Sequence, residues 1–220
     1  EAFKPHFCFN LHDQRTIFSA GKNNKPATVS FLAPAQDKKC AVTNTRQIAM
    51  EIIVSMNTML QNYIPNSVGV YDDAFNLNCV GDTFQSNNTP TILFEAGHFK
   101  DDYAREEVRK LIFGSLLIAL ESISKNDNLG VNFQAYFKIP QNQKLFYDIL
   151  IRNAKVLINS KEKVVDIAIQ YKEVLVGKKV CFIPKIEDFG ALSKFFGHKE
   201  INAKSQQVVL GGSEPLETEN

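Results

Sequence analysis

Long apolar runs, an excess of charge and an export signal are all missing from this sequence. No run in its 220 residues approaches the roughly 18 to 20 apolar residues that a helix needs to cross a bilayer. The 25 lysines and arginines nearly balance the 24 aspartates and glutamates, and the formal net charge is +1. This balance argues against bulk attraction to nucleic acid or to an anionic membrane, so neither is an expected partner. Because the first residues contain no basic segment followed by an apolar core, we expect a cytoplasmic protein.

Two further signals of function are also missing. The four cysteines, Cys8, Cys40, Cys79 and Cys181, form no Cys-x-x-Cys pair, which excludes a zinc knuckle and a thioredoxin-type motif. We expect them to be buried, reduced thiols. No glycine-rich loop joins a strand to a helix, and this disfavours a flavodoxin-like or Rossmann nucleotide binder.

The sequence does contain an alternation of strand-like and helix-like segments. Apolar runs at 6–12, 28–34 and 91–95 are typical of core strands. Apolar residues recur at helical spacing over 44–63 and again over 101–125. The order strand, strand, helix, strand, helix indicates an α/β sheet covered by helices.

After residue 130 this alternation ends. Three β-like runs separated by polar turns follow, at 144–153, 162–176 and 178–186. The stretch 67–88, between the first helix and the third strand, is broken by glycines and asparagines and is predicted to be mostly loop with brief extended pieces. We therefore predict an α/β domain, a small β-rich domain and a disordered tail, at residues 1–128, 140–210 and 211–220.

His12 is the first candidate for a functional side chain. It lies between Asn10 and Asp13 where an apolar strand meets a polar loop, the position at which α/β proteins carry their sites. One interpretation is a metal ligand whose tautomer is fixed by polar neighbours. The alternative is a half-exposed histidine that is hydrogen-bonded to a loop.

Glu95 is the second candidate, because it ends the nearly continuous apolar strand TILFE. A carboxylate there is costly to bury without a partner, and its pKa is expected to rise. A raised pKa suits a general base that works near neutral pH. The alternative is a glutamate that pairs with Arg105 or Arg109 at the edge of the core.

Together the segments FNLHDQ and TILFEAGHF resemble two segments of the zinc carboxypeptidase family, which includes the succinylglutamate desuccinylases and aspartoacylases. The resemblance covers about residues 5–124. It implies that His12 is the third zinc ligand and that Glu95 is the catalytic glutamate. The family's mechanism would have zinc polarise an amide while Glu95 takes a proton from water and gives it to the leaving amine. The implied substrate is a peptide or an N-acyl amino acid.

The resemblance is incomplete, because none of the four histidines begins the family's His-x-x-Glu motif. Two zinc ligands and the arginines that grip a substrate carboxylate are therefore not found in this sequence. Either the chain is the C-terminal part of a longer enzyme, as its abrupt start suggests, or it never had a full site. A lone histidine should hold zinc weakly, so we expect little activity from this chain alone.

Two weaker candidates and one rival function remain. Tyr71 corresponds loosely to a substrate-contacting tyrosine of some family members, and His98 lies close enough to Glu95 in sequence to line the same pocket. The rival from another class is a non-catalytic binding module, in which the β-rich domain recognises a partner. That alternative would be favoured if His12 and Glu95 faced opposite sides of the sheet.

Overall fold

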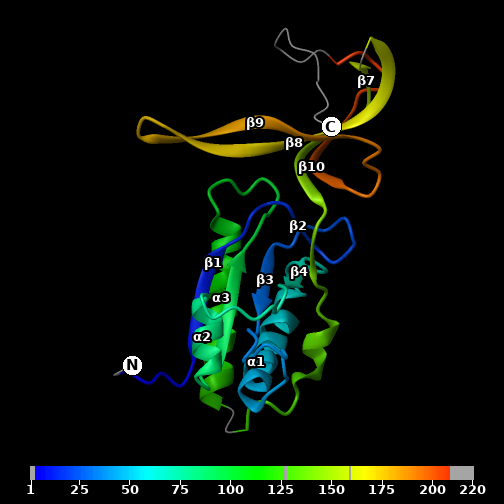
Figure 1. Cartoon of the computed structure of the whole chain (residues 1–220). Helices are drawn as coiled ribbons and strands as arrows, with labels where there is room; N and C mark the ends of the chain where they lie inside the picture. The colour runs from blue at the N-terminus through cyan, green and yellow to red at the C-terminus, as the bar shows by residue number, and fades with distance from the viewer. Residues whose placement is uncertain (1–2, 126–127, 159, 209–220) are drawn as a thin grey trace. The chain divides into compact units, whose positions relative to one another are not determined.

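The computed structural model describes residues 3–125, 128–158 and 160–208, and the chain forms two compact units, residues 1–144 and 145–220 (Figure 1). The first unit is a mixed α/β structure and the second is mainly β, which confirms the predicted fold class. The finer domain limits stay predictions, and the predicted tail 211–220 lies outside the described residues. None of the described helices is long and apolar enough to span a membrane.

The first unit is built on a four-stranded mixed sheet. Its strand order is β1-β5-β3-β4, and β3 is antiparallel to β5 whereas the other two pairings are parallel. A two-stranded antiparallel sheet, β2 with β6, lies beside it in the same unit. The strands are β1 (Cys8–Asp13), β2 (Phe18–Ala20), β3 (Val29–Leu32), β4 (Val68–Val70), β5 (Thr91–Ala96) and β6 (Asn142–Lys144).

One face of the main sheet carries the core of the unit. Phe31 and Phe94 are paired on the neighbouring strands β3 and β5, so their rings lie on the same side of the sheet, where they meet edge to face at 5.3 Å. This side packs against the apolar stripe of α1, whose Met50, Ile53 and Met56 are fully buried. The helical elements of the unit are α1 (Asn44–Leu60), α2 (Val80–Ser86), α3 (Glu106–Lys125) and the 3-10 helix η1 (Phe133–Lys138).

Each of the two long helices differs from its predicted range at one end. α1 ends at Leu60 rather than at residue 63. α1 begins after Thr43, whose hydroxyl accepts a hydrogen bond from the Arg46 amide at 3.3 Å. The second long helix begins at Glu106 rather than at residue 101, and Asp102 accepts the Val108 amide at 3.0 Å as its cap. The short strand β4 agrees with the brief extended pieces predicted in 67–88, whereas the seven-residue helix α2 was not predicted.

The second unit is a four-stranded sheet in the order β10-β7-β8-β9. Its strands are β7 (Phe146–Ile158), β8 (Lys161–Val176), β9 (Lys179–Gly190) and β10 (Phe196–Asn202). The three predicted β-like runs are confirmed. The last strand, β10, was not among the predicted runs.

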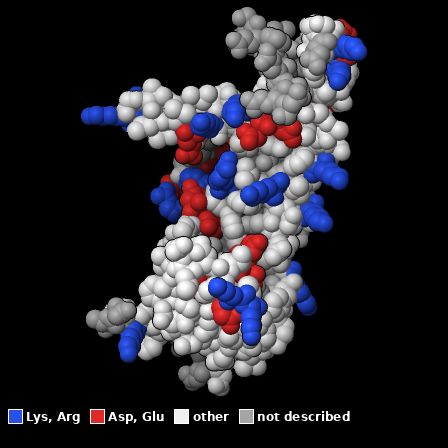
Figure 2. All heavy atoms as spheres, viewed as in Figure 1, with Lys and Arg blue, Asp and Glu red and all other residues white. Residues whose placement is uncertain are grey.

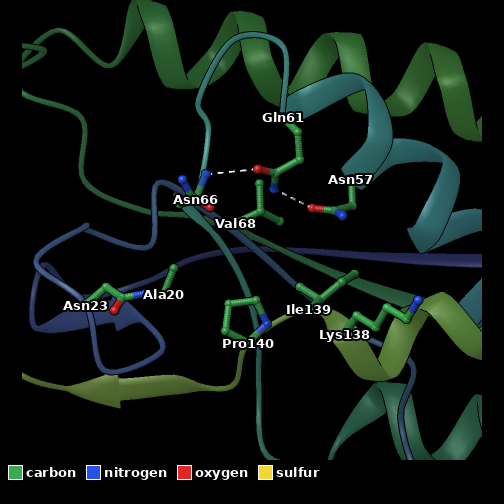
Figure 3. Close-up of a pocket in the computed structure, with 9 residues that line it drawn as sticks. All are labelled: Ala20, Asn23, Asn57, Gln61, Asn66, Val68, Lys138, Ile139 and Pro140. Carbon is green, nitrogen blue, oxygen red and sulfur yellow. Dashed lines mark hydrogen bonds between the residues drawn. The ribbon is translucent and has the colours of Figure 1, made fainter.

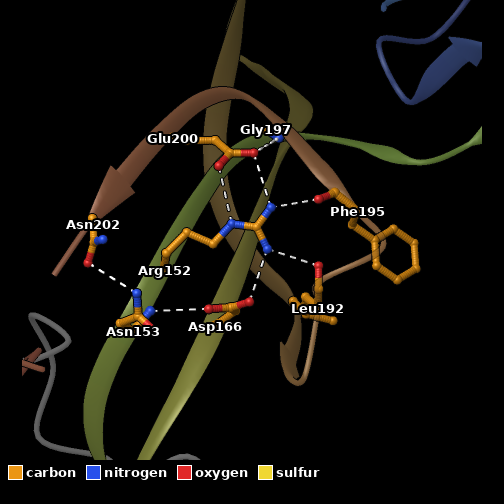
Figure 4. Close-up of polar contacts among 8 residues, drawn as sticks. All are labelled: Arg152, Asn153, Asp166, Leu192, Phe195, Gly197, Glu200 and Asn202. Carbon is orange, nitrogen blue, oxygen red and sulfur yellow. Dashed lines mark hydrogen bonds and ion pairs between the residues drawn. The ribbon is translucent and has the colours of Figure 1, made fainter. Parts of the chain in front are cut away.

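Arg152 ties the strands of the second unit together (Figure 4). Its guanidinium donates to Asp166 on β8 at 3.0 Å and to Glu200 on β10 at 3.1 Å. It also donates to the carbonyls of Leu192 and Phe195, at 2.9 and 2.7 Å. All these acceptors belong to the same unit, so Arg152 is a structural centre of that sheet.

The cysteines are free, as expected, but they are not buried. Cys8 and Cys40 are half-buried, and Cys79 and Cys181 are exposed. Cys79 precedes α2 at the surface, and Cys181 lies on a strand with an uncovered face. The prediction of buried thiols was therefore wrong, because apolar neighbours in sequence do not guarantee a covered strand.

Candidate functional site

His12 and Glu95 are direct neighbours in the sheet. β1 and β5 are parallel, and their register pairs His12 with Glu95. Paired residues on adjacent strands project to the same face, and the strands are about 4.8 Å apart. The two side chains therefore share a face near the carboxyl ends of both strands. This pairing removes the observation that would have favoured the binding-module alternative.

The same row continues across the sheet to Ser30 and Gly69. Ser30 pairs with Glu95 on one side and with Gly69 on the other. The row lies on the face opposite to Phe31 and Phe94, because successive residues of a strand alternate between faces. Glu95 thus projects away from the main core and toward polar neighbours.

Two carboxamides close over this row where glycines leave room for them. Asn142 donates to the Ser30 hydroxyl at 2.9 Å, and a Cβ atom on Gly69 would lie only 1.9 Å from the Asn142 Oδ1 atom. Gln14 donates to the carbonyl of Ala27, and a Cβ atom on Gly97 would lie 2.1 Å from the Gln14 Nε2 atom. Glycine inside a strand pattern is the sequence signal for such close approach. We call Gln14, Ser30 and Asn142 the amide wall.

Glu95 is buried without a charged partner. Glu95 is only 9% exposed, and its Oε2 atom has no hydrogen-bond partner among the described residues. Burial raises the pKa of Glu95 to about 7, and the nearby charge of Asp13 adds to the shift. A carboxyl group with this pKa exchanges protons near neutral pH, as a general base must.

The ion-pair alternative for Glu95 is wrong. Arg105 pairs with Asp13 and donates to the carbonyls of Gly97 and Ala96, at 2.8 and 2.9 Å. Arg109 pairs with Glu106 one helical turn away. Both guanidinium groups are therefore engaged with other acceptors.

Tyr71 belongs to the surroundings of Glu95. Burial raises the pKa of its phenol, and the charge of Glu95 raises that pKa further, so the two groups interact electrostatically. The Tyr71 ring packs edge to face on Phe18 at 5.2 Å, which fixes its direction. This tyrosine directly follows β4, one strand beyond Ser30 in the sheet.

His98 is not brought into the row by the sheet. It lies beyond the end of β5, where it is half-buried and makes an interaction of its own. The register that joins His12 to Glu95 ends at the Asp13–Ala96 pair. His98 therefore stays a weaker candidate than Tyr71.

The residues present do not complete a zinc site. Across residues 3–125, 128–158 and 160–208, no group of three His, Cys, Asp or Glu side chains is close enough to hold a metal. His12 is exposed and has a suitable ligand chemistry, but zinc sites need at least three protein ligands. Further ligands could approach only from outside these residues.

The side of β1 beyond His12 is open. In the described part of the sheet β1 is an edge strand, because it pairs with β5 alone. Leu11, next to His12, is 57% exposed. An uncovered edge strand can accept another strand, and such a strand would run directly beside His12.

A separate pocket of about 190 Å³ lies away from these residues (Figure 3). Its lining includes Asn57, Gln61 and Asn66, and it contains none of His12, Tyr71, Glu95 and His98. The Gln61 amide donates to Asn57 at 2.8 Å and accepts the Asn66 backbone amide at 2.9 Å. These three amides bond to one another, and the lining also includes Lys138.

Sequence reasoning had missed the amide wall. Ser30 is an ordinary residue in a short strand, and Asn142 is 112 residues away from it. Only Gly69 and Gly97 carried a local signal. Comparisons with known proteins add no assignment: no family model, no curated protein and no solved structure matches the chain.

Proposed function

We propose that this chain carries part of the catalytic site of a zinc-dependent hydrolase of amide bonds, of the carboxypeptidase type. The observation that carries the proposal is the in-register pairing of His12 with Glu95, whose buried carboxyl group has no charged partner. The substrate would be a peptide, cut at its C-terminal bond, or an N-acyl amino acid. Tyr71, which interacts electrostatically with Glu95, is the candidate for contacting the substrate.

Glu95 is the residue that moves protons in this proposal. In its ionised form it takes a proton from the attacking water, and in its neutral form it gives that proton to the leaving amine. A pKa of about 7 allows both forms at neutral pH. Because Oε2 is buried and unpaired, the carboxyl group is not held by a competing donor of the described chain.

His12 would contribute one imidazole ligand to zinc. When bound, zinc supplies Lewis acidity, which polarises the amide and acidifies water. The remaining ligands must come from outside the described residues, and the open edge of β1 is where a segment carrying them could dock. His12 alone is expected to hold zinc weakly.

The function can be tested in the natural full-length protein by hydrolysis assays. The substrates are peptides, cut at their C-terminal bond, and N-acyl amino acids, each with added zinc and with a chelator. Replacing Glu95→Gln keeps the shape but removes the base, and kcat should fall by roughly 10² to 10⁴-fold. The matched control is Glu107→Gln on α3, an exposed glutamate that should leave kcat unchanged. Near-full activity of the Glu95→Gln variant would remove Glu95 from the mechanism. Failure of the wild-type protein on both substrate classes would contradict the function itself.

A further inference from the structure

The second unit contains a two-stranded ribbon that no third strand supports. β7 pairs with β8 only as far as Ile169, whereas β8 and β9 continue to pair up to Val176 and Lys179. We call residues 171–185 the ribbon; it extends beyond the rest of its own sheet (Figure 1). An isolated two-stranded hairpin is marginally stable in water, so a covering surface would stabilise it.

Every residue of the ribbon is exposed except the half-buried Val174. The cross-strand pairs place Leu175 with Val180 on one face, and Val176 and Ile183 project to the other. Leu175 is 71% exposed and Phe182 62%, and Val176 and Ile183 are 56% and 47% exposed on the second face. Large apolar side chains are therefore uncovered on both faces, and an exposed apolar patch of this kind marks an interaction surface.

The ribbon is also basic, although the whole chain is nearly neutral. It carries four lysines and one glutamate, a net charge of +3, against +1 for the entire chain. Figure 2 shows basic side chains at the free end of the ribbon. No ion pair among the described residues involves these lysines, so their charges are available to a partner.

We propose that the ribbon docks on an anionic lipid surface, with its apolar side chains at the boundary between headgroups and acyl chains. A flat protein surface would cover one face of the ribbon and leave the other in water. A bilayer boundary surrounds both faces, and its lipid phosphates meet the lysines, whose long stems reach them from an apolar position. The free backbone edges of the ribbon keep it out of the hydrocarbon interior, where unpaired amides are costly.

The chemistry of the ribbon disfavours two other partners. A second copy would bring two surfaces of charge +3 together, and like charges repel. Nucleic acid would meet mostly aliphatic side chains and no arginine, whereas arginine is prominent in nucleic-acid-binding surfaces. The proposal concerns the second unit alone and does not depend on the function of Glu95.

The absence of tryptophan from the chain gives a direct test. A Phe182→Trp variant carries a single tryptophan, on the ribbon, which can be excited selectively. Its emission should shift to shorter wavelength with vesicles of phosphatidylcholine and phosphatidylglycerol, and much less with phosphatidylcholine alone. The control is Phe113→Trp on α3, at a side chain that is 60% exposed, which should not shift. An equal shift at both positions, or no shift with either vesicle, would overturn the proposal.

Vesicle co-sedimentation of the full chain measures the charge contribution. Replacing Lys178→Gln and Lys179→Gln together should weaken binding to the anionic vesicles roughly fivefold for each lysine. Added salt should also weaken the binding of the wild-type chain, because it screens the attraction between lysines and lipid phosphates. The adjacent exposed pair Lys38→Gln and Lys39→Gln is the matched control and should leave binding unchanged. Equal losses in both double variants would contradict docking through the ribbon. So would a dimer that dissociates when the ribbon lysines are replaced, or binding to duplex DNA in place of vesicles.

Discussion

The two units bury their strands to very different extents. Every residue of β3 and β4 in the first unit is buried, whereas every residue of β9 in the second unit is exposed or half-buried. Helices cover the first sheet, and none of the described residues of the second unit forms an α-helix. Two features stand out against this background: a buried carboxyl group without a partner in the first unit, and apolar side chains exposed on both faces of a ribbon in the second. Such exceptions are where function is to be sought.

The comparison is sharpest when the same substitution is made in both units. Phe94→Ala removes a ring that is 1% exposed in the core of the first unit, and should lower the free energy of unfolding by about 3–5 kcal/mol. Phe182→Ala on the ribbon should change it by less than about 0.5 kcal/mol, because that ring is already in water. Urea denaturation measures both. Similar losses at the two positions would show that the ribbon is covered in solution, and would break the comparison.

The pH dependence of stability isolates the exception in the first unit. The pKa of Glu95 is raised from 4.5 to about 7 on folding, so between these values the folded chain holds a proton that the unfolded chain has lost. The free energy of unfolding should therefore fall as pH rises through this window, by on the order of 3 kcal/mol, and then level off. Glu95→Gln should remove this fall, as urea denaturation at several pH values would measure.

Glu107→Gln on α3 is the control for that experiment. It makes the same chemical change at an exposed glutamate, and should leave the pH dependence as in the wild-type chain. If the Glu95→Gln variant kept the wild-type slope, the buried carboxyl group would not be the group that titrates. Glu95 would then lose the support that its raised pKa gives to a role as general base.

Local patterns in the sequence predicted much of the first unit. The helical spacing of Met56 and its neighbours gave α1, and apolar runs gave β1, β3 and β5. Placing His12 and Glu95 at strand ends followed from those runs. Their pairing in register depends on a contact between strands 83 residues apart, and no local pattern specifies it.

The second unit was harder to predict because its apolar pattern is the same for a covered and an uncovered strand. The ribbon has apolar residues on both faces, which is also the pattern of a fully buried strand. Phe182 and Ile183 are exposed because no other described element packs on the faces of the ribbon. β10 was missed for a related reason, since its parallel pairing with β7 joins segments about 50 residues apart.

A smaller loss than that of Phe94→Ala is expected from a substitution that tests the amide wall. Gly69→Ala puts a Cβ atom 1.9 Å from the Asn142 Oδ1 atom, so the Asn142 side chain must move and lose its bond to Ser30. We expect the free energy of unfolding to fall by about 1–3 kcal/mol. Combining Gly69→Ala with Asn142→Ala should cost less than the sum of the two single changes, because the clash is then gone.

Gly114→Ala on α3 is the control: its Cβ atom would meet only Met59 at 3.4 Å, and it should be neutral or stabilising by up to about 1 kcal/mol. Strict additivity of the two changes would show that Asn142 does not lie over Gly69, and that Asn142 is not part of the amide wall.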